Sequence, residues 1–108
     1  MATNFNIADL TSIGSTRTLL YTCPSGTQAV IFSGTVSNID GSHLDQSLTI
    51  EALKVDGTTY IMVGNAIIVP FGSSLILPKI ALLAGEKLYL TGSTAGSLTA
   101  RASIVEKT

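Results

Sequence analysis

The sequence predicts an all-β protein, an antiparallel β-sandwich or jelly roll of about eight strands with an N-terminal arm. Short alternating or β-branched segments follow one another, with turn residues every eight to twelve residues or so, a spacing typical of sandwiches. The three prolines lie only where strands are expected to end, which is where a sheet tolerates them. No helical segment separates the strands, and this disfavours a parallel α/β sheet. The 108 residues are the size of one domain.

Residues 1–16 differ from the rest, and we expect them to form an arm in front of a sandwich domain over 17–108. Their apolar residues are Phe5, Ile7, Leu10 and Ile13, set among polar side chains. The last three follow at three-residue steps, which suits a short helix capped by Asn6. An extended arm lying on a neighbouring molecule fits equally well. In either form, we expect these four side chains to contact a partner.

In the first half of the domain, strands are expected over 18–23, 29–36, 48–52 and 58–63. The turn sequence Pro24-Ser25-Gly26 ends the first strand, and 38–42 forms a polar loop after the second. After residue 52 the alternation slips by one, so that Leu53 and Val55 carry the apolar side, and this predicts a β-bulge. Asp56-Gly57 is a tight hairpin signal.

In the second half, strands are expected over 66–69, 73–77, 80–83, 87–91 and 98–104. Gly64-Asn65, Pro70-Phe71-Gly72, Pro78 and Ala84-Gly85-Glu86 separate them. The last strand alternates most clearly. It is expected to place Leu98, Ala100, Ala102 and Ile104 inward.

Composition excludes several classes of protein. The apolar share of 45% rules out disorder, while charged residues make up 12%, about half of the usual quarter. With a net charge of −1 and six scattered basic residues, we expect no nucleic-acid binding. The apolar stretches 66–71 and 80–84 are far shorter than the roughly 20 residues of a membrane span. No signal peptide is visible, so we expect synthesis in the cytosol and no membrane partner.

Few residues offer chemistry. Cys23 is the single cysteine, which excludes an internal disulfide and a thiolate metal site. His43 lies between Asp40 and Asp45, but a solvated loop explains this group better than a metal or acid–base site. A Cys23–His43 nucleophilic pair is the remaining catalytic arrangement, and Glu51 and Glu86 are formally available as paired carboxylates. We expect no enzyme activity, cofactor or metal.

The tyrosines have two interpretations. Tyr21, Tyr60 and Tyr89 fall on separate expected strands, where tyrosines usually pack on the sheet. If they shared one face, they would form a carbohydrate-stacking surface.

The low charge points to a surface covered by other proteins. A free sandwich normally carries Lys and Glu on its outer face, which also block edge pairing. Here residues 29–36 are uncharged on both sides, and Ile67, Ile68 and Val69 are consecutive, so one of them points away from the core. We expect a protein interface, and a homotrimer or another cyclic homo-oligomer.

Three segments carry a resemblance to a known group of proteins. They read Leu20-Tyr21-Thr22-Cys23-Pro24-Ser25-Gly26-Thr27-Gln28-Ala29-Val30-Ile31, Val69-Pro70-Phe71-Gly72-Ser73-Ser74-Leu75 and Leu83-Ala84-Gly85-Glu86-Lys87-Leu88. Together with Lys79-Ile80 and the closing strand, this order resembles small β-sandwich virion proteins of tailed bacteriophages, over residues Leu20 to Glu106. The shared positions are structural, so no functional residue is carried over.

The resemblance implies a non-enzymatic phage virion structural protein, most specifically a capsid decoration (cement) protein that bridges capsid subunits. Its implied partners are further copies of itself and the major capsid protein or other virion proteins. It would be located in the virion, after assembly in the host cytoplasm. The alternative is a neck, tail or fibre-associated domain, either structural or binding a glycan or receptor.

Overall fold

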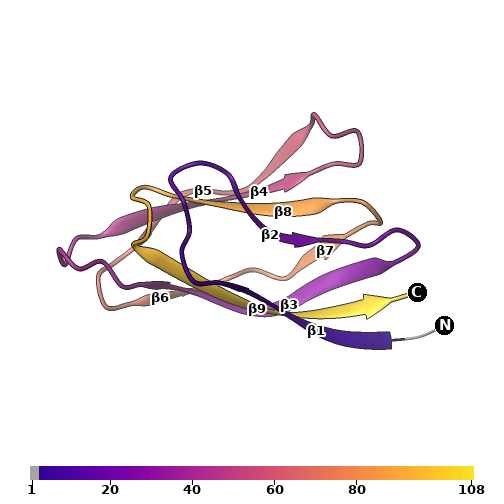
Figure 1. The fold of residues 1–108 in the computed structure, drawn as a ribbon, viewed down its shortest axis with the longest axis horizontal. Coiled ribbons are helices and arrows are strands. Elements are labelled where there is room, and N and C mark those ends of the chain that lie inside the picture. Colours follow the sequence, from indigo (N-terminus) through magenta and orange to yellow (C-terminus); the bar gives the residue numbers. More distant parts are fainter. Residues whose placement is uncertain (1–2) are drawn as a thin grey trace.

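The computed structural model describes residues 3–108 and contains nine strands and no helix in that part of the chain (Figure 1). The strands are β1 (Thr3–Leu10), β2 (Thr18–Thr22), β3 (Gln28–Asn38), β4 (Gln46–Leu53), β5 (Tyr60–Val69), β6 (Ser74–Ile76), β7 (Ile80–Leu82), β8 (Lys87–Gly92) and β9 (Leu98–Lys107). All pairings between them are antiparallel. The predicted all-β sandwich is confirmed.

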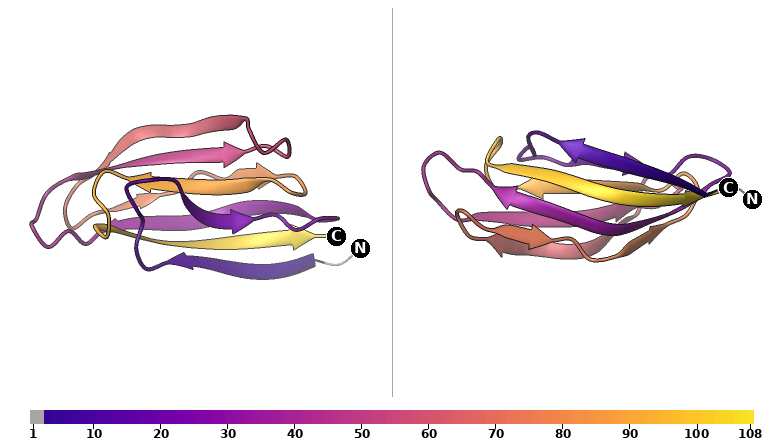
Figure 2. Two further views of the ribbon diagram at one scale, coloured as in Figure 1. Left: turned by 45° about the horizontal axis from the view of Figure 1, so that its top comes forward. Right: turned by 90° about the horizontal axis from the view of Figure 1, so that it is seen from below.

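The strands form two sheets that lie one on the other (Figure 2). Sheet A has the order β1-β9-β3-β6, with β7 also paired to β3, and sheet B has the order β2-β8-β4-β5. Because β6 and β7 pair with successive parts of β3 and only residues 77–79 separate them, they act as one strand interrupted at Pro78. Apart from the β4–β5 hairpin, the chain then changes sheet at each connection, as in a jelly roll.

The core lies between the sheets and consists of inward-facing aliphatic side chains. In β9, Leu98, Ala100, Ala102 and Ile104 are all buried, as the alternation predicts. Leu88 and Leu90 of β8 and Leu48 and Ile50 of β4 are fully buried opposite them. Among residues 3–108, every buried side-chain nitrogen or oxygen has a hydrogen-bond partner.

The N-terminal segment is a strand and not a helix. β1 pairs with β9 along its whole length, from Thr3 opposite Lys107 to Leu10 opposite Ala100. The helical alternative is therefore wrong, because a helix this short is marginal alone, while pairing with β9 satisfies backbone groups along the strand. The division into an arm over 1–16 and a domain over 17–108 stays a prediction.

Two strands of the structure depart from simple alternation. The bulge expected after residue 52 in β4 lies in β5, which has extra residues around Gly64, whereas β4 pairs with β8 without a register shift. Residues 60–63 and 66–69 consequently belong to one strand and are not separated by a turn, while Thr58 and Thr59 lie in the hairpin turn before it. Ala66 has a φ of 48°, and its amide donates to the Thr49 hydroxyl of β4 at 3.2 Å. A second irregularity lies between Ile31 and Ser33 of β3. Even-numbered residues such as Val30 face outward before it, and odd-numbered residues such as Thr35 face outward after it.

Candidate assembly surface

The outer face of sheet A carries an uncharged apolar surface that crosses three strands. The register places Phe5 of β1 opposite Val105 of β9, and Val105 opposite Val30 of β3. Phe5 and Ile7 are 64% and 45% exposed. The rings of Phe5 and Phe32 pack edge to face, with centroids 5.5 Å apart. We call Phe5, Ile7, Val30, Phe32 and Val105 the sheet A patch.

The charges of sheet A lie at the margins of this patch. At one end of the patch, the Arg101 guanidinium of β9 lies 3.5 Å from the Asp9 carboxylate of β1. Lys107 lies at the other end of β9. Between them, Ser103 of β9 faces Ile7 of β1. A contiguous uncharged apolar surface of this kind is typical of a protein interface.

The four predicted partner contacts are not on one surface. Phe5 and Ile7 lie in the sheet A patch, whereas Leu10 is half-buried and packs against the core. Ile13 is fully buried, and its amide donates to the Leu98 carbonyl at 2.9 Å. In the structure, therefore, only the first two are available to a partner molecule. The sequence did not identify Val105 as a member of the surface, because its place beside Phe5 follows from the β1–β9 register.

The outer face of sheet B carries a second group of side chains, which brings two of the three tyrosines together. The rings of Tyr60 and Tyr89 have centroids 6.0 Å apart. The Arg17 guanidinium lies 3.6 Å from the Tyr60 ring centroid and donates two hydrogen bonds to Glu51, of 3.1 and 3.0 Å. This cation–π and bidentate pairing occupies one face of Tyr60. No pattern in the sequence pointed to Arg17, because it lies 34 positions from Glu51.

Tyr21 is separate from this group and belongs to the core between the sheets. It is 7% exposed, and its hydroxyl donates to the Glu106 carboxylate of β9. Burial, and secondly this hydrogen bond and the charge of Glu106, raise the pKa of Tyr21 well above its ordinary value of 10.0.

This raised pKa predicts a loss of stability at alkaline pH. Above pH 10 the unfolded chain releases the Tyr21 proton while the folded chain retains it, so the free energy of unfolding should fall as the pH rises. The free energy of unfolding of Tyr21→Phe, measured by urea unfolding, should fall less steeply between pH 10 and 12. Tyr89→Phe, which removes a tyrosine from the sheet B surface, should keep the wild-type slope. Equal slopes for wild type and Tyr21→Phe would contradict this assignment.

The structure does not bring the candidate catalytic residues together. Cys23 is 1% exposed beside the β7–β8 turn, where its amide donates to the Glu86 carbonyl, and burial raises the pKa of its thiol. His43 lies in the loop at the other end of the sandwich, with its ring on Phe71. Glu51 pairs with Arg17 and Glu86 with Lys54, in separate places.

The loop around His43 is held by its own carboxylates. The Asp40 carboxylate accepts hydrogen bonds from the Leu44 amide, at 2.9 Å, and from the Ser97 hydroxyl. These hydrogen bonds, above all the one from Leu44, lower the pKa of Asp40. Asp45 accepts from the Phe71 amide at 3.1 Å. Within residues 3–108, no three His, Cys, Asp or Glu side chains lie close enough together to hold a metal ion. The same residues include no helix with the length and hydrophobicity to cross a membrane.

Comparison with known proteins identifies a fold but no family. No protein-family model matches the sequence, and no curated protein matches it. A solved structure described as "Bacillus endospore appendages form a novel family of disulfide-linked pili" is similar, with a TM-score of 0.59 and 18% identity over 99% of this chain and 87% of that one. At this identity the likeness shows a shared fold alone.

A second solved structure is a pentameric capsid protein isolated from metagenomic phage sequences. It has a TM-score of 0.46 and 21% identity, and the match covers 92% of this chain and 59% of that one. A TM-score this low does not establish a common fold. The chain is therefore an all-β jelly-roll protein of the same fold as a pilus protein.

Proposed function

We propose that this chain is a non-enzymatic structural protein of a phage virion, a capsid decoration protein that bridges capsid subunits. The observation that carries the proposal is the sheet A patch, an apolar surface without a charged side chain at its centre. On a capsid, many copies with a modest interface each would strengthen the shell by repetition. The resemblance of the sequence to virion proteins supports the choice of particle.

The proposal includes self-association into a trimer or another cyclic oligomer. The fold shared with a protein that forms pili supports a role in assembly. Pili of that type are described as disulfide-linked, but the single cysteine of this chain is buried, with its sulfur 3.3 Å from the Thr27 carbonyl. We therefore propose that copies of this chain associate without a covalent bond.

Co-sedimentation with capsid shells tests the role of the patch. The wild-type protein should pellet with shells of the phage that encodes it, and the double variant Phe5→Glu/Ile7→Glu should lose at least about tenfold in affinity, because it places two charges in the apolar contact. Both positions are exposed, so the fold should persist, which circular dichroism checks.

Ile68→Glu is the matched control, because Ile68 is 59% exposed on the opposite sheet. It should pellet like the wild type. Equal binding by the wild type and the patch variant would refute the sheet A patch as the contact, and a wild-type protein that ignores shells would refute the decoration role.

The second candidate is a glycan-binding or receptor-binding domain of a tail or fibre. The observation that favours it is the group Arg17, Glu51, Tyr60 and Tyr89, in which aromatic rings and polar groups share one outer face. Tyr89→Ala should then abolish retention on a glycan array and leave shell binding unchanged. Since Arg17 already covers one face of Tyr60, we rank this function second.

A further inference from the structure

The two ends of the sandwich differ in shape. At one end, the β2–β3 turn, the β4–β5 hairpin and the β7–β8 turn surround a cavity of about 730 Å³. Val55 and Leu83, which are 65% and 58% exposed, are its large apolar side chains. We call this cavity the end groove.

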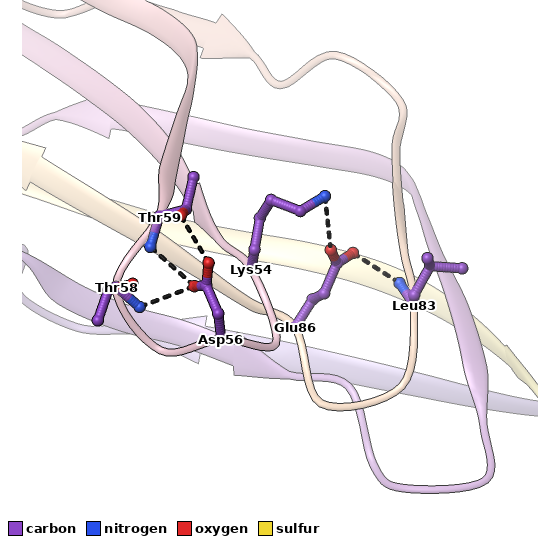
Figure 3. Close-up of polar contacts among 6 residues, drawn as sticks. All are labelled: Lys54, Asp56, Thr58, Thr59, Leu83 and Glu86. Carbon is purple, nitrogen blue, oxygen red and sulfur yellow. Dashed lines mark hydrogen bonds and ion pairs between the residues drawn. The ribbon is translucent and has the colours of Figure 1, made fainter.

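The walls of the end groove are held in place by local bonds (Figure 3). The Asp56 carboxylate accepts from the amides of Thr58 and Thr59, which closes the hairpin that carries Val55. Glu86 accepts from the Leu83 amide at 2.8 Å and lies 3.9 Å from the Lys54 ammonium, so it joins the turn to the hairpin. A groove with such fixed walls loses little entropy on binding.

The opposite end of the sandwich carries exposed apolar side chains. Ile39, Leu44 and Phe71 are 55%, 60% and 43% exposed there, and we call them the apolar tip. Figure 1 shows the loop after β3 and the loop after β5 together at the end away from the β4–β5 hairpin. Long strands such as β3 and β9 connect the two ends.

The apolar tip is also held in a fixed conformation. The side-chain amide of Asn38 donates to the carbonyls of Leu44 and Val69, each at 2.9 Å. The His43 ring packs on Phe71, with centroids 4.4 Å apart. The exposed apolar side chains therefore lie on two loops that hydrogen bonds and ring packing connect, and a group of exposed apolar side chains is typical of a surface that a partner covers.

The charges of the two ends are complementary. Asp40 and Asp45 flank the apolar tip, and residues 38–47, 69–74 and 91–98 around it contain no Lys or Arg. Of the described residues that line the end groove, Lys107 is the one with a charged side chain. Near the groove, Lys54 offsets the charge of Glu86, while Asp56 accepts hydrogen bonds within its own turn. Two tips, each with Asp40 and Asp45, would repel each other, whereas Lys107 in the groove would attract a tip.

We propose that the apolar tip of one copy of this chain docks in the end groove of a second copy, with Leu44 and Phe71 against Val55 and Leu83, and Lys107 near Asp40 and Asp45. This contact joins unlike surfaces, so its repetition closes a ring or extends a filament, according to the rotation between copies. This contact would provide the self-association that the proposed function includes. Only in that respect does it rest on the proposed function. It leaves the sheet A patch free for another partner.

Sedimentation velocity of two single variants and their mixture tests the contact. Every contact of this kind needs one tip and one groove, so Leu44→Glu and Leu83→Glu should each sediment as monomers, with association at least about tenfold weaker than in the wild type. In an equimolar mixture, the intact tip of Leu83→Glu meets the intact groove of Leu44→Glu. The mixture should therefore form dimers and nothing larger.

The controls separate this contact from other effects. Val55→Asp is a second groove variant, and circular dichroism verifies the fold of each variant, all of which change exposed residues. Leu19→Glu, on the outer face of sheet B, should associate like the wild type, as should Phe5→Glu/Ile7→Glu. A monomeric wild type at high concentration, unchanged association of the single variants, or a mixture that stays monomeric would each overturn the proposal. None of these results tests the binding of capsid shells, so the failure of this contact and the failure of the decoration role can be told apart.

Discussion

Ile13→Ala is expected to lower the free energy of unfolding by about 3 kcal/mol, because it removes a fully buried side chain and leaves a cavity in the core. Ile13 is anchored there by the bond of its amide to Leu98 and lies beside Gly92, so the surroundings cannot easily collapse. Urea unfolding measures the change, and in a domain of this size the melting temperature should fall by more than about 10 °C.

Ile7→Ala is the matched control, since it makes the same substitution in the same segment at a side chain that is 45% exposed. It should cost less than about 1 kcal/mol. The pair separates a core role from a contact role within residues 1–16. A cost for Ile13→Ala as small as that for Ile7→Ala would mean that Ile13 is not packed in the core in solution.

Asn38→Ala is expected to lower the free energy of unfolding by about 3 kcal/mol. Asn38 is 3% exposed, and its side chain donates to two carbonyls and accepts from the Asp40 amide at 2.9 Å. Alanine removes all three bonds and leaves buried polar groups without partners, which costs more than the bonds themselves contribute. Chemical denaturation measures the change.

Hydrogen exchange gives a second readout for this variant. The amides of residues 39–45 should exchange faster in Asn38→Ala, because the side chain of Asn38 fixes that loop against β5. Asn65→Ala, at an exposed asparagine of β5, should change stability by less than about 0.5 kcal/mol. If Asn38→Ala were as mild, the loop would be held by its carboxylates alone. Faster exchange should also weaken the docking of the apolar tip, since the loop would have to be ordered on binding.

Most strands could be predicted because their signals are local. Alternation in residues 98–104, the Asp56-Gly57 hairpin and the break at Pro78 depend only on neighbouring residues and on backbone preferences. The prediction that one of Ile67, Ile68 and Val69 points outward is confirmed, since Ile68 is 59% exposed and Val69 is buried. These features follow from side-chain period and turn chemistry.

Local signals could not show which of the four expected partner contacts, Phe5, Ile7, Leu10 and Ile13, face outward. Phe5 and Ile7 point outward and Leu10 packs inward because β1 pairs with β9, whose residues lie about a hundred positions along the chain. The β3 irregularity near Phe32 likewise depends on its pairing with β9 and not on the residues of β3 alone. In a sheet, a shift of one residue exchanges the faces, so a partner strand is needed to decide which side chains are exposed.

By itself, the sequence determined that this chain is a β-rich domain with little charge, and where most of its turns lie, because period, turn residues and composition are properties of short segments. Only the tertiary structure decided that residue 13 fills the core, that Arg17 covers Tyr60, and that a groove and an acidic apolar tip lie at opposite ends. Those arrangements depend on contacts between distant residues, and the register of paired strands sets them.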